Sequence, residues 1–87
     1  MKALTGAQIR AARGLLRWSA EELAREAALG LATIRRAENA EIHSMTAAND
    51  LSVRRALESA GVEFIDENGG GAGVRLRKPT RGGSQKR

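Results

Sequence analysis

The 87-residue chain contains no cysteine and no tyrosine, and it has only one tryptophan, one phenylalanine and one proline. The lack of cysteine excludes a disulfide scaffold, a thiol nucleophile and any Cys-ligated metal site. With so few aromatic side chains, a core of this size must be aliphatic. Apolar runs fall far short of the roughly 18 residues that a membrane span requires, and no secretory signal is visible. We therefore expect one small domain, soluble and cytoplasmic, without a membrane association.

Basic residues are concentrated at the C-terminal end of the chain. The formal net charge is +5, but the segment 75–87 alone holds six Lys or Arg residues and no acidic ones. Residues 1–74 carry nine basic and ten acidic side chains. The positive net charge therefore comes from the tail. The tail either binds phosphates without regard to base sequence or aids solubility.

Helix start signals recur along the first half of the chain. Thr5 is followed three residues later by Gln8, and Ser19 by Glu22, which is the spacing of a capping box. Gly30 is an acceptable N-cap for a further helix. These caps and the helical spacing of the apolar residues predict three short helices, at residues 6–16, 20–27 and 31–39.

A fourth helix and a change of period follow. The fourth helix starts near Ser44 or Thr46 and runs to Ala60, where Gly61 provides a left-handed terminator. Apolar residues then alternate with polar ones, which predicts two strands around a Gly-rich loop. The chain thus divides into a helical segment, a hairpin and a disordered basic tail, at residues 1–61, 62–77 and 78–87.

The second and third helices, joined by a three-residue turn and flanked by a helix on each side, form a helix-turn-helix arrangement. Residues 19–39 read SAEELAREAALGLATIRRAEN. This stretch resembles the lambda-repressor/Cro-like (XRE-type) regulators in its Glu-Leu-Ala, its apolar turn residue Leu29, its Thr-Ile and its closing Glu-Asn. The resemblance extends over residues 8–62. Together with the strand pattern, it predicts a mainly α, four- to five-helix domain of this type followed by a short C-terminal β-hairpin.

Three positions depart from the family pattern. Ala20 stands where the family usually has a phosphate-contacting Gln. Ala28 and Arg17 stand where it usually has Gly, so the backbone at these two positions must either avoid or tolerate a left-handed angle.

The resemblance implies that helix 31–39 enters the major groove, with Leu31, Ala32, Arg35 and Arg36 at the reading positions. Leu31 and Ala32 can touch a thymine methyl group but cannot donate a hydrogen bond. Discrimination then rests on Arg36, and secondarily on Arg35, because each guanidinium can bind a guanine edge in a bidentate manner. The alternative is that both arginines bind only phosphates or lie on a solvated face.

Four further residues are candidates for contacts to the DNA backbone. The resemblance places Thr33 in packing or against a phosphate, and Asn39 against a phosphate, with a solvated helix end as the alternative for Asn39. Ser19 and Gly30 could offer backbone amides at helix N-termini, although capping alone explains Ser19.

Arg13 and Glu38 match an ion pair that is buried in this family and ties the first helix to the end of the recognition helix. The alternative is two unrelated surface charges. If the pair exists, removing one partner leaves a buried charge behind and destabilises the fold.

The remaining singular residues have simpler interpretations. We expect Trp18 to be a core residue. His43 has no second ligand at metal-site spacing, so a solvated loop or a phosphate contact is expected there. Arg54 and Arg55 are expected on a solvated face of the fourth helix, with a DNA-backbone contact as the alternative.

The favoured function is sequence-specific binding of double-stranded DNA by a homodimer that acts as a repressor, plausibly of its own promoter. The hairpin is the candidate dimer interface, since a two-stranded ribbon is marginal alone and must pack on the helices or on a second copy. The alternative is a protein–protein module, such as an antitoxin or antiactivator, that uses the same fold to bind a protein partner. No residue spacing indicates an enzyme, a cofactor or a metal site.

Overall fold

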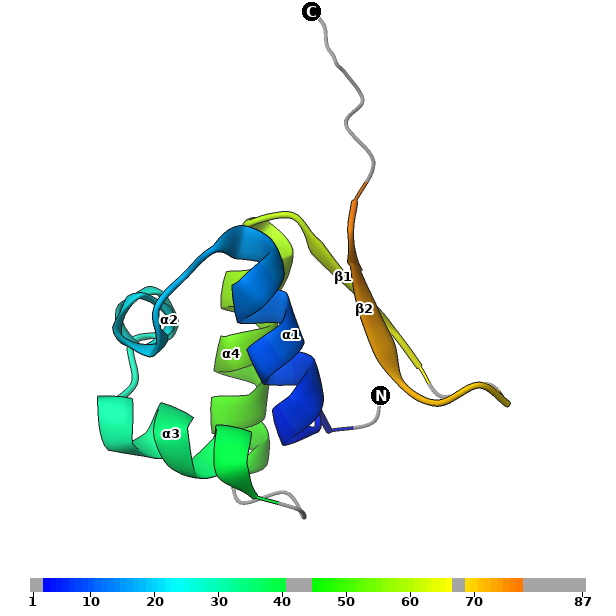
Figure 1. Ribbon diagram of the computed structural model, residues 1–87. Helices are drawn as coiled ribbons and strands as arrows, with labels where there is room; N and C mark the ends of the chain where they lie inside the picture. The colour runs from blue at the N-terminus through cyan, green and yellow to red at the C-terminus, as the bar shows by residue number, and fades with distance from the viewer. Residues whose placement is uncertain (1–2, 41–44, 67–68, 78–87) are drawn as a thin grey trace, which may run out of the picture.

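The computed structural model describes residues 3–40, 45–66 and 69–77. Within these residues, four helices precede one antiparallel hairpin (Figure 1): α1 (Gly6–Leu16), α2 (Ala20–Ala27), α3 (Leu31–Asn39), α4 (Ala47–Ser59), β1 (Val62–Ile65) and β2 (Gly73–Leu76). The predicted mainly helical class with a small C-terminal hairpin is confirmed. The first three helices have the predicted bounds, and both strands lie within the predicted hairpin at residues 62–77. The predicted tail, His43 and Ser44 lie outside the described residues.

Local capping explains where the helices begin. Both predicted capping boxes are formed: the Gln8 amide donates to Thr5 Oγ1 at 3.0 Å, and the Glu22 amide donates to Ser19 Oγ at 3.0 Å. Of the two candidate caps for α4, Thr46 is the one used, because its Oγ1 accepts the Asn49 amide at 3.1 Å.

Two helices end at left-handed residues that are not glycine. The C-cap of α1, Arg17, has φ 59°, and the C-cap of α2, Ala28, has φ 57°. The chain therefore tolerates the left-handed angle at both positions, which costs roughly 1–2 kcal/mol for a residue that carries a Cβ. In return, each cap amide bonds carbonyls in the last turn of its helix.

One aliphatic core is shared by the helices and the hairpin. Every helix and β1 contribute side chains that are completely or almost completely buried: Ile9, Leu23, Ile34, Val53, Leu57 and Val62. Trp18 is half-buried and packs against this core, as do Phe64 and Val74 of the hairpin. The predicted boundary at residue 61 thus separates two types of secondary structure but not two cores.

The hairpin lies against α1 and α4, on the far side of these helices from α2 and α3 (Figure 1). Pairing of Phe64 with Val74 and of Val62 with Leu76 places these four side chains on one face of the ribbon. Gln8 fixes the ribbon to α1, since its Nε2 donates to the Gly73 carbonyl at 3.2 Å.

The expectation of a solvated Arg54 is wrong. Only 5% of Arg54 is exposed, because the hairpin folds back over α4 and its Phe64 ring centroid lies 5.2 Å from the guanidinium carbon. The carboxylate of Glu58, one turn along α4, is 4.0 Å away. Arg55 is exposed, as predicted.

None of the helices in the described part of the chain combines the length and the apolar character needed to cross a bilayer.

Candidate nucleic-acid interface

The outer face of α3 carries half of the predicted DNA-contacting residues. Its inner face is buried in the core through Ile34, Ala37 and Glu38. The exposed residues are Ala32, Arg35, Arg36 and Asn39. At about 100° per residue, Arg35 and Arg36 lie on opposite sides of a strip that holds Ala32 and Asn39. The exposed face therefore presents two long cationic side chains on either side of a small one.

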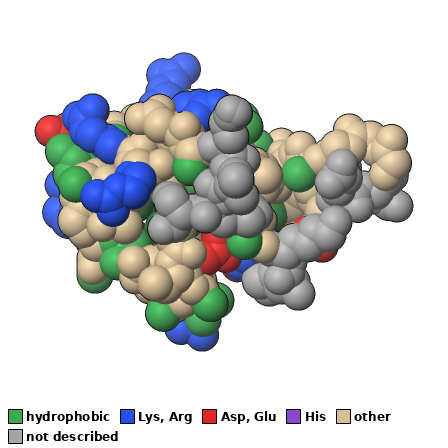
Figure 2. Space-filling model, turned by 90° about the horizontal axis from the view of Figure 1, so that it is seen from below, with side chains coloured by type: hydrophobic (Ala, Val, Ile, Leu, Met, Phe, Trp, Pro, Cys, Tyr) green, Lys and Arg blue, Asp and Glu red, His purple; other side chains and the backbone are tan. Residues whose placement is uncertain are grey.

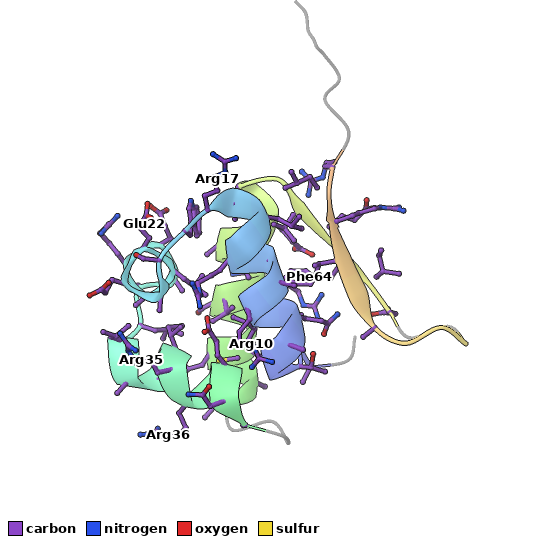
Figure 3. All side chains as sticks on the ribbon, viewed as in Figure 1. Arg10, Arg17, Glu22, Arg35, Arg36 and Phe64 are labelled. Carbon is purple, nitrogen blue, oxygen red and sulfur yellow. The ribbon has the colours of Figure 1, made fainter. Side chains whose placement is uncertain are left out.

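The two arginines on this face have no acidic partner in the described part of the chain. Across residues 3–40, 45–66 and 69–77, no carboxylate lies within 4.0 Å of Arg35 or Arg36. Arg36 extends below α3, away from the rest of the molecule, and Arg35 lies on the same helix nearer α2 (Figure 3). Seen from this side, the surface shows more Lys and Arg than Asp and Glu (Figure 2).

The N-terminus of α3 is also accessible. Gly30 is exposed and caps the helix through its backbone alone, without a side-chain hydrogen bond to the first turn. Leu31 and Thr33 are half-buried, and Ala32 is exposed beside them. The first turn of α3, at the positive end of the helix dipole, is therefore not capped by a side chain of its N-cap residue.

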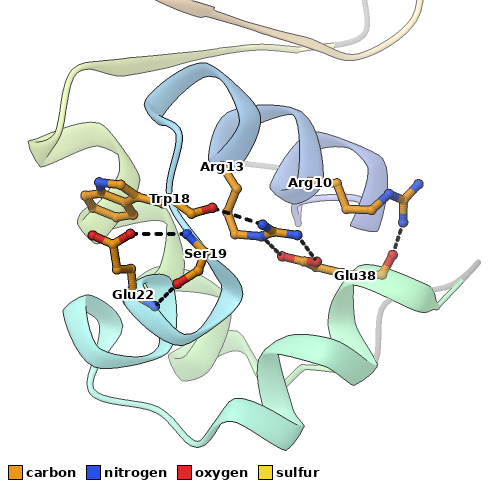
Figure 4. Close-up of polar contacts among 6 residues, drawn as sticks. All are labelled: Arg10, Arg13, Trp18, Ser19, Glu22 and Glu38. Atoms are coloured by element: carbon orange, nitrogen blue, oxygen red, sulfur yellow. Dashed lines mark hydrogen bonds and ion pairs between the residues drawn. The ribbon is translucent and has the colours of Figure 1, made fainter.

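Ser19 differs from Gly30 because its polar groups are already engaged. Its hydroxyl accepts the Glu22 amide at 3.0 Å, and its own amide donates to Glu22 Oε1 at 3.2 Å (Figure 4). Both contacts belong to the cap of α2 and agree with capping as the role of Ser19.

The structure brings together the predicted ion pair. Arg13 binds Glu38 through two contacts, Nε to Oε2 at 2.6 Å and Nη2 to Oε1 at 2.9 Å. The Arg13 side chain is 24% exposed and that of Glu38 is 7% exposed. The hydrogen bond to Glu38 raises the pKa of Arg13 above its ordinary value. This bidentate geometry fixes the end of α3 relative to α1.

Arg13 also links the two helices of the candidate motif. Its Nη1 donates to the Trp18 carbonyl at 3.0 Å, immediately before Ser19, while Glu38 immediately precedes Asn39 (Figure 4). The start of α2 and the end of α3 are therefore held by one guanidinium, and the candidate backbone contacts Ser19 and Asn39 each adjoin it in sequence.

Two residues near this site were not singled out from the sequence. Gly6 is buried against the end of α3, where a Cβ would lie 2.5 Å from the Glu38 carbonyl oxygen and 2.8 Å from that of Ala37. Arg10 is exposed, and its Nη1 donates to the same Glu38 carbonyl. With Arg13, they form one stripe of α1 that contacts the last turn of α3. Their i, i+4, i+7 spacing was the available sequence signal.

Comparisons with known proteins give no independent assignment: no protein-family model matches the chain, and no curated protein sequence is similar to it. The exposed chemistry of α3 is therefore the basis on which a function is assigned.

Proposed function

We propose that this protein is a sequence-specific, double-stranded DNA-binding transcriptional regulator of the lambda-repressor/Cro-like helix-turn-helix type. In this proposal α3 is the recognition helix and enters the major groove. The observation that carries it is the outer face of α3, where two unneutralised arginines flank the small side chain of Ala32. A helix of this width fits the major groove, in which each base pair displays a distinct pattern of donors and acceptors.

Base recognition would depend on the chemistry of this face. Ala32 and Leu31 offer only apolar contact, which suits a thymine methyl group. Arg36, and secondarily Arg35, would each donate two hydrogen bonds to a guanine, at about 1–3 kcal/mol of discrimination per good bidentate pair. The small Ala32 lets the helix backbone approach the base edges closely between them.

Backbone contacts would set the position of α3 in the groove. The first turn after Gly30, which has no side-chain cap, would offer amides to a phosphate at one end. Asn39, exposed at the other end, offers a side-chain amide, while Thr33 at the side of the helix is half-buried. Ala20 supplies no such contact at the start of α2, so this protein would depend more heavily on the two ends of α3.

A homodimer would extend the recognised site to two half-sites. Figure 1 places α3 along the lower edge of the molecule and the hairpin on the right, on the other side of α1 and α4. A two-fold axis beside the hairpin would turn both copies of α3 to one side, as half-sites about 34–36 Å apart require. Ile65, which is 38% exposed and lies on the opposite face of the ribbon from Val62 and Phe64, is available for that contact. Sedimentation as a monomer at micromolar concentration, with and without DNA, would count against the dimer.

The decisive measurement is fluorescence anisotropy on DNA from upstream of the protein's own reading frame and on a scrambled duplex. An autoregulatory repressor should prefer the upstream DNA by about a thousandfold or more. Arg36→Ala should remove most of that preference by losing a base contact. Arg55→Ala, which deletes an exposed arginine on α4, is the matched control and should retain the preference. Equal binding of both duplexes by the wild type would contradict sequence-specific regulation through this DNA.

A second candidate function is a protein–protein module such as an antitoxin or antiactivator. The observation that favours it is the exposure of large apolar side chains. Leu15 on α1 is 40% exposed, Leu76 on β2 is 48% exposed and Ile65 on β1 is 38% exposed. Co-purification with a defined partner that is lost in Leu76→Ser, together with the absence of DNA preference, would favour this function over the first.

A further inference from the structure

Arg10 occupies a specific place at the C-terminal end of α3. Its Nη1 donates to the backbone carbonyl of Glu38, the penultimate residue of that helix, yet Arg10 itself is exposed. A guanidinium has five N–H donors in a rigid planar arrangement. One contact with the carbonyl thus fixes the orientation of the group and leaves most of its donors directed elsewhere.

The charge of Arg10 changes the character of this end of α3. The terminal carbonyls of a helix carry a partial negative charge, which repels an approaching phosphate. The Glu38 carboxylate does not neutralise Arg10, since both of its oxygens are bound by Arg13. Among the residues that the structure describes, no carboxylate lies within 4.0 Å of Arg10. An uncompensated cation therefore covers a helix end that would otherwise repel a phosphate.

Asn39 adjoins this cation. Its backbone nitrogen is bonded to the same Glu38 carbonyl carbon whose oxygen accepts the Arg10 hydrogen bond, and Asn39 is exposed. The Arg10 guanidinium of α1 is thus bound at the peptide group that joins Glu38 to Asn39, the exposed last residue of α3. Gly6 and Arg13 of α1 keep them in register by fixing the last turn of α3.

We propose that Arg10 and Asn39 together bind one backbone phosphate of the DNA, at the end of α3 opposite Gly30. This inference rests on the proposed function and deepens it by assigning a phosphate site that includes a residue outside the helix-turn-helix segment. The contact is indifferent to base sequence because it is made to the phosphate alone. It holds α3 at a fixed depth while Arg35 and Arg36 read bases.

The test measures affinity for the upstream and scrambled duplexes across a salt series, for wild type, Arg10→Gln and Arg10→Lys. The slope of log K against log salt is negative, and loss of one phosphate contact should reduce its magnitude by about 0.9. We expect the magnitude of the slope to fall by this amount in Arg10→Gln. The variant should bind both duplexes several-fold more weakly, with the ratio of the two affinities unchanged. Arg10→Lys keeps the charge and should retain the slope. Arg55→Gln removes an equal charge from α4 and should also leave the slope unchanged.

The possible results separate this inference from the function on which it rests. If the wild type prefers neither duplex and Arg10→Gln has a slope of smaller magnitude, the phosphate site is supported and the proposal of a sequence-specific regulator is contradicted. A specific wild type whose slope is the same in Arg10→Gln overturns the phosphate site alone. A changed duplex ratio with an unchanged slope also overturns it, because Arg10 then acts only by holding α3. A wild type that binds no DNA overturns both.

Discussion

Two arginine–glutamate pairs, one between α1 and α3 and one within the hairpin, differ strongly in burial. On the α3 side, Arg13 Nε lies 2.6 Å from Glu38 Oε2, with side chains 24% and 7% exposed. On the hairpin, which packs on the other side, Arg75 Nε lies 2.8 Å from Glu63 Oε1, with side chains 64% and 46% exposed. The two shortest distances are similar, but the first pair is bidentate and largely buried, whereas the second has one hydrogen bond and is exposed. Breaking the buried pair between Arg13 and Glu38 is costly, whereas solvent screens the exposed pair between Arg75 and Glu63.

The interface of α1 with α3 and the interface of the hairpin with the helices also differ in the kind of contact. The α3 side is made by backbone approach at Gly6 and by charged hydrogen bonds to Glu38. The hairpin side is made mainly by apolar packing of Val62 and Phe64 on the core. Apolar packing is forgiving of small shifts, whereas a close backbone contact and a bidentate ion pair specify one orientation. The side with directional contacts is the one that positions the candidate recognition helix.

The largest expected effect is that of Arg13→Ala. The substitution leaves the Glu38 carboxylate buried without its partner and also removes the donor to the Trp18 carbonyl. Breaking a buried pair costs about 3–5 kcal/mol, and the partial exposure of Arg13 places the expected loss at the lower end. Urea melts of the two proteins measure it. A loss of less than about 1 kcal/mol in the free energy of unfolding would mean that this pair contributes no more than an exposed surface pair does. The difference between the buried and the exposed pair would then disappear.

Gly6→Ala tests the backbone contact on the same side of α1. The new Cβ would lie 2.5 Å from the Glu38 carbonyl oxygen, so the last turn of α3 has to move. Overpacking of this kind costs about 1–3 kcal/mol. We expect a lower urea midpoint with an unchanged m-value, and weaker binding to the upstream DNA because α3 is displaced. An unchanged midpoint would mean that α1 and α3 separate easily at this point.

Gly14→Ala is the matched substitution on the same helix and should have the opposite sign. A Cβ at Gly14 meets nothing within 4 Å, and the residue is exposed in the helix interior. Ala in such a position stabilises a helix by about 0.5–1 kcal/mol relative to Gly. Thermal melts of both variants measure the difference. If both substitutions destabilise equally, the cost at Gly6 comes from the helix itself and not from α3.

The sequence predicted those features that depend on neighbouring residues. The capping boxes at Thr5 and Ser19 lie within four residues each, so the starts of α1 and α2 were predicted to the residue. The outer face of α3 followed from helical periodicity and from the family resemblance. Whether that face contacts DNA stays a prediction.

The features that were not predicted depend on segments far apart in the chain. Arg54 is buried because the hairpin folds over α4, which no pattern within α4 indicates. The hydrogen bond from Arg10 spans 28 residues, and the close approach of Gly6 depends on the same crossing of α1 and α3. Helical spacing put these residues on a common stripe with Arg13, but only the packed structure gives the distance to α3.

The smallest expected effect is that of Glu63→Gln on the hairpin. The hydrogen bond from Arg75 lowers the pKa of Glu63 in the folded protein. A carboxyl group with a lowered folded pKa contributes stability above its unfolded pKa of about 4.3, and that contribution is lost as the pH falls through the folded value. The difference between wild type and Glu63→Gln should therefore be present at neutral pH and vanish in acid.

Screening sets the size of this last effect. Both side chains are about half exposed or more, so the difference should be small and should shrink further as salt is added. Urea melts of both proteins, at neutral and acidic pH and at low and high salt, measure it. An effect that persists in high salt and rivals that of Arg13→Ala would show that the exposed pair within the hairpin stabilises the protein as much as the buried pair does. The difference between the two sides of α1 would then lie in the backbone approach at Gly6 and not in the burial of charge.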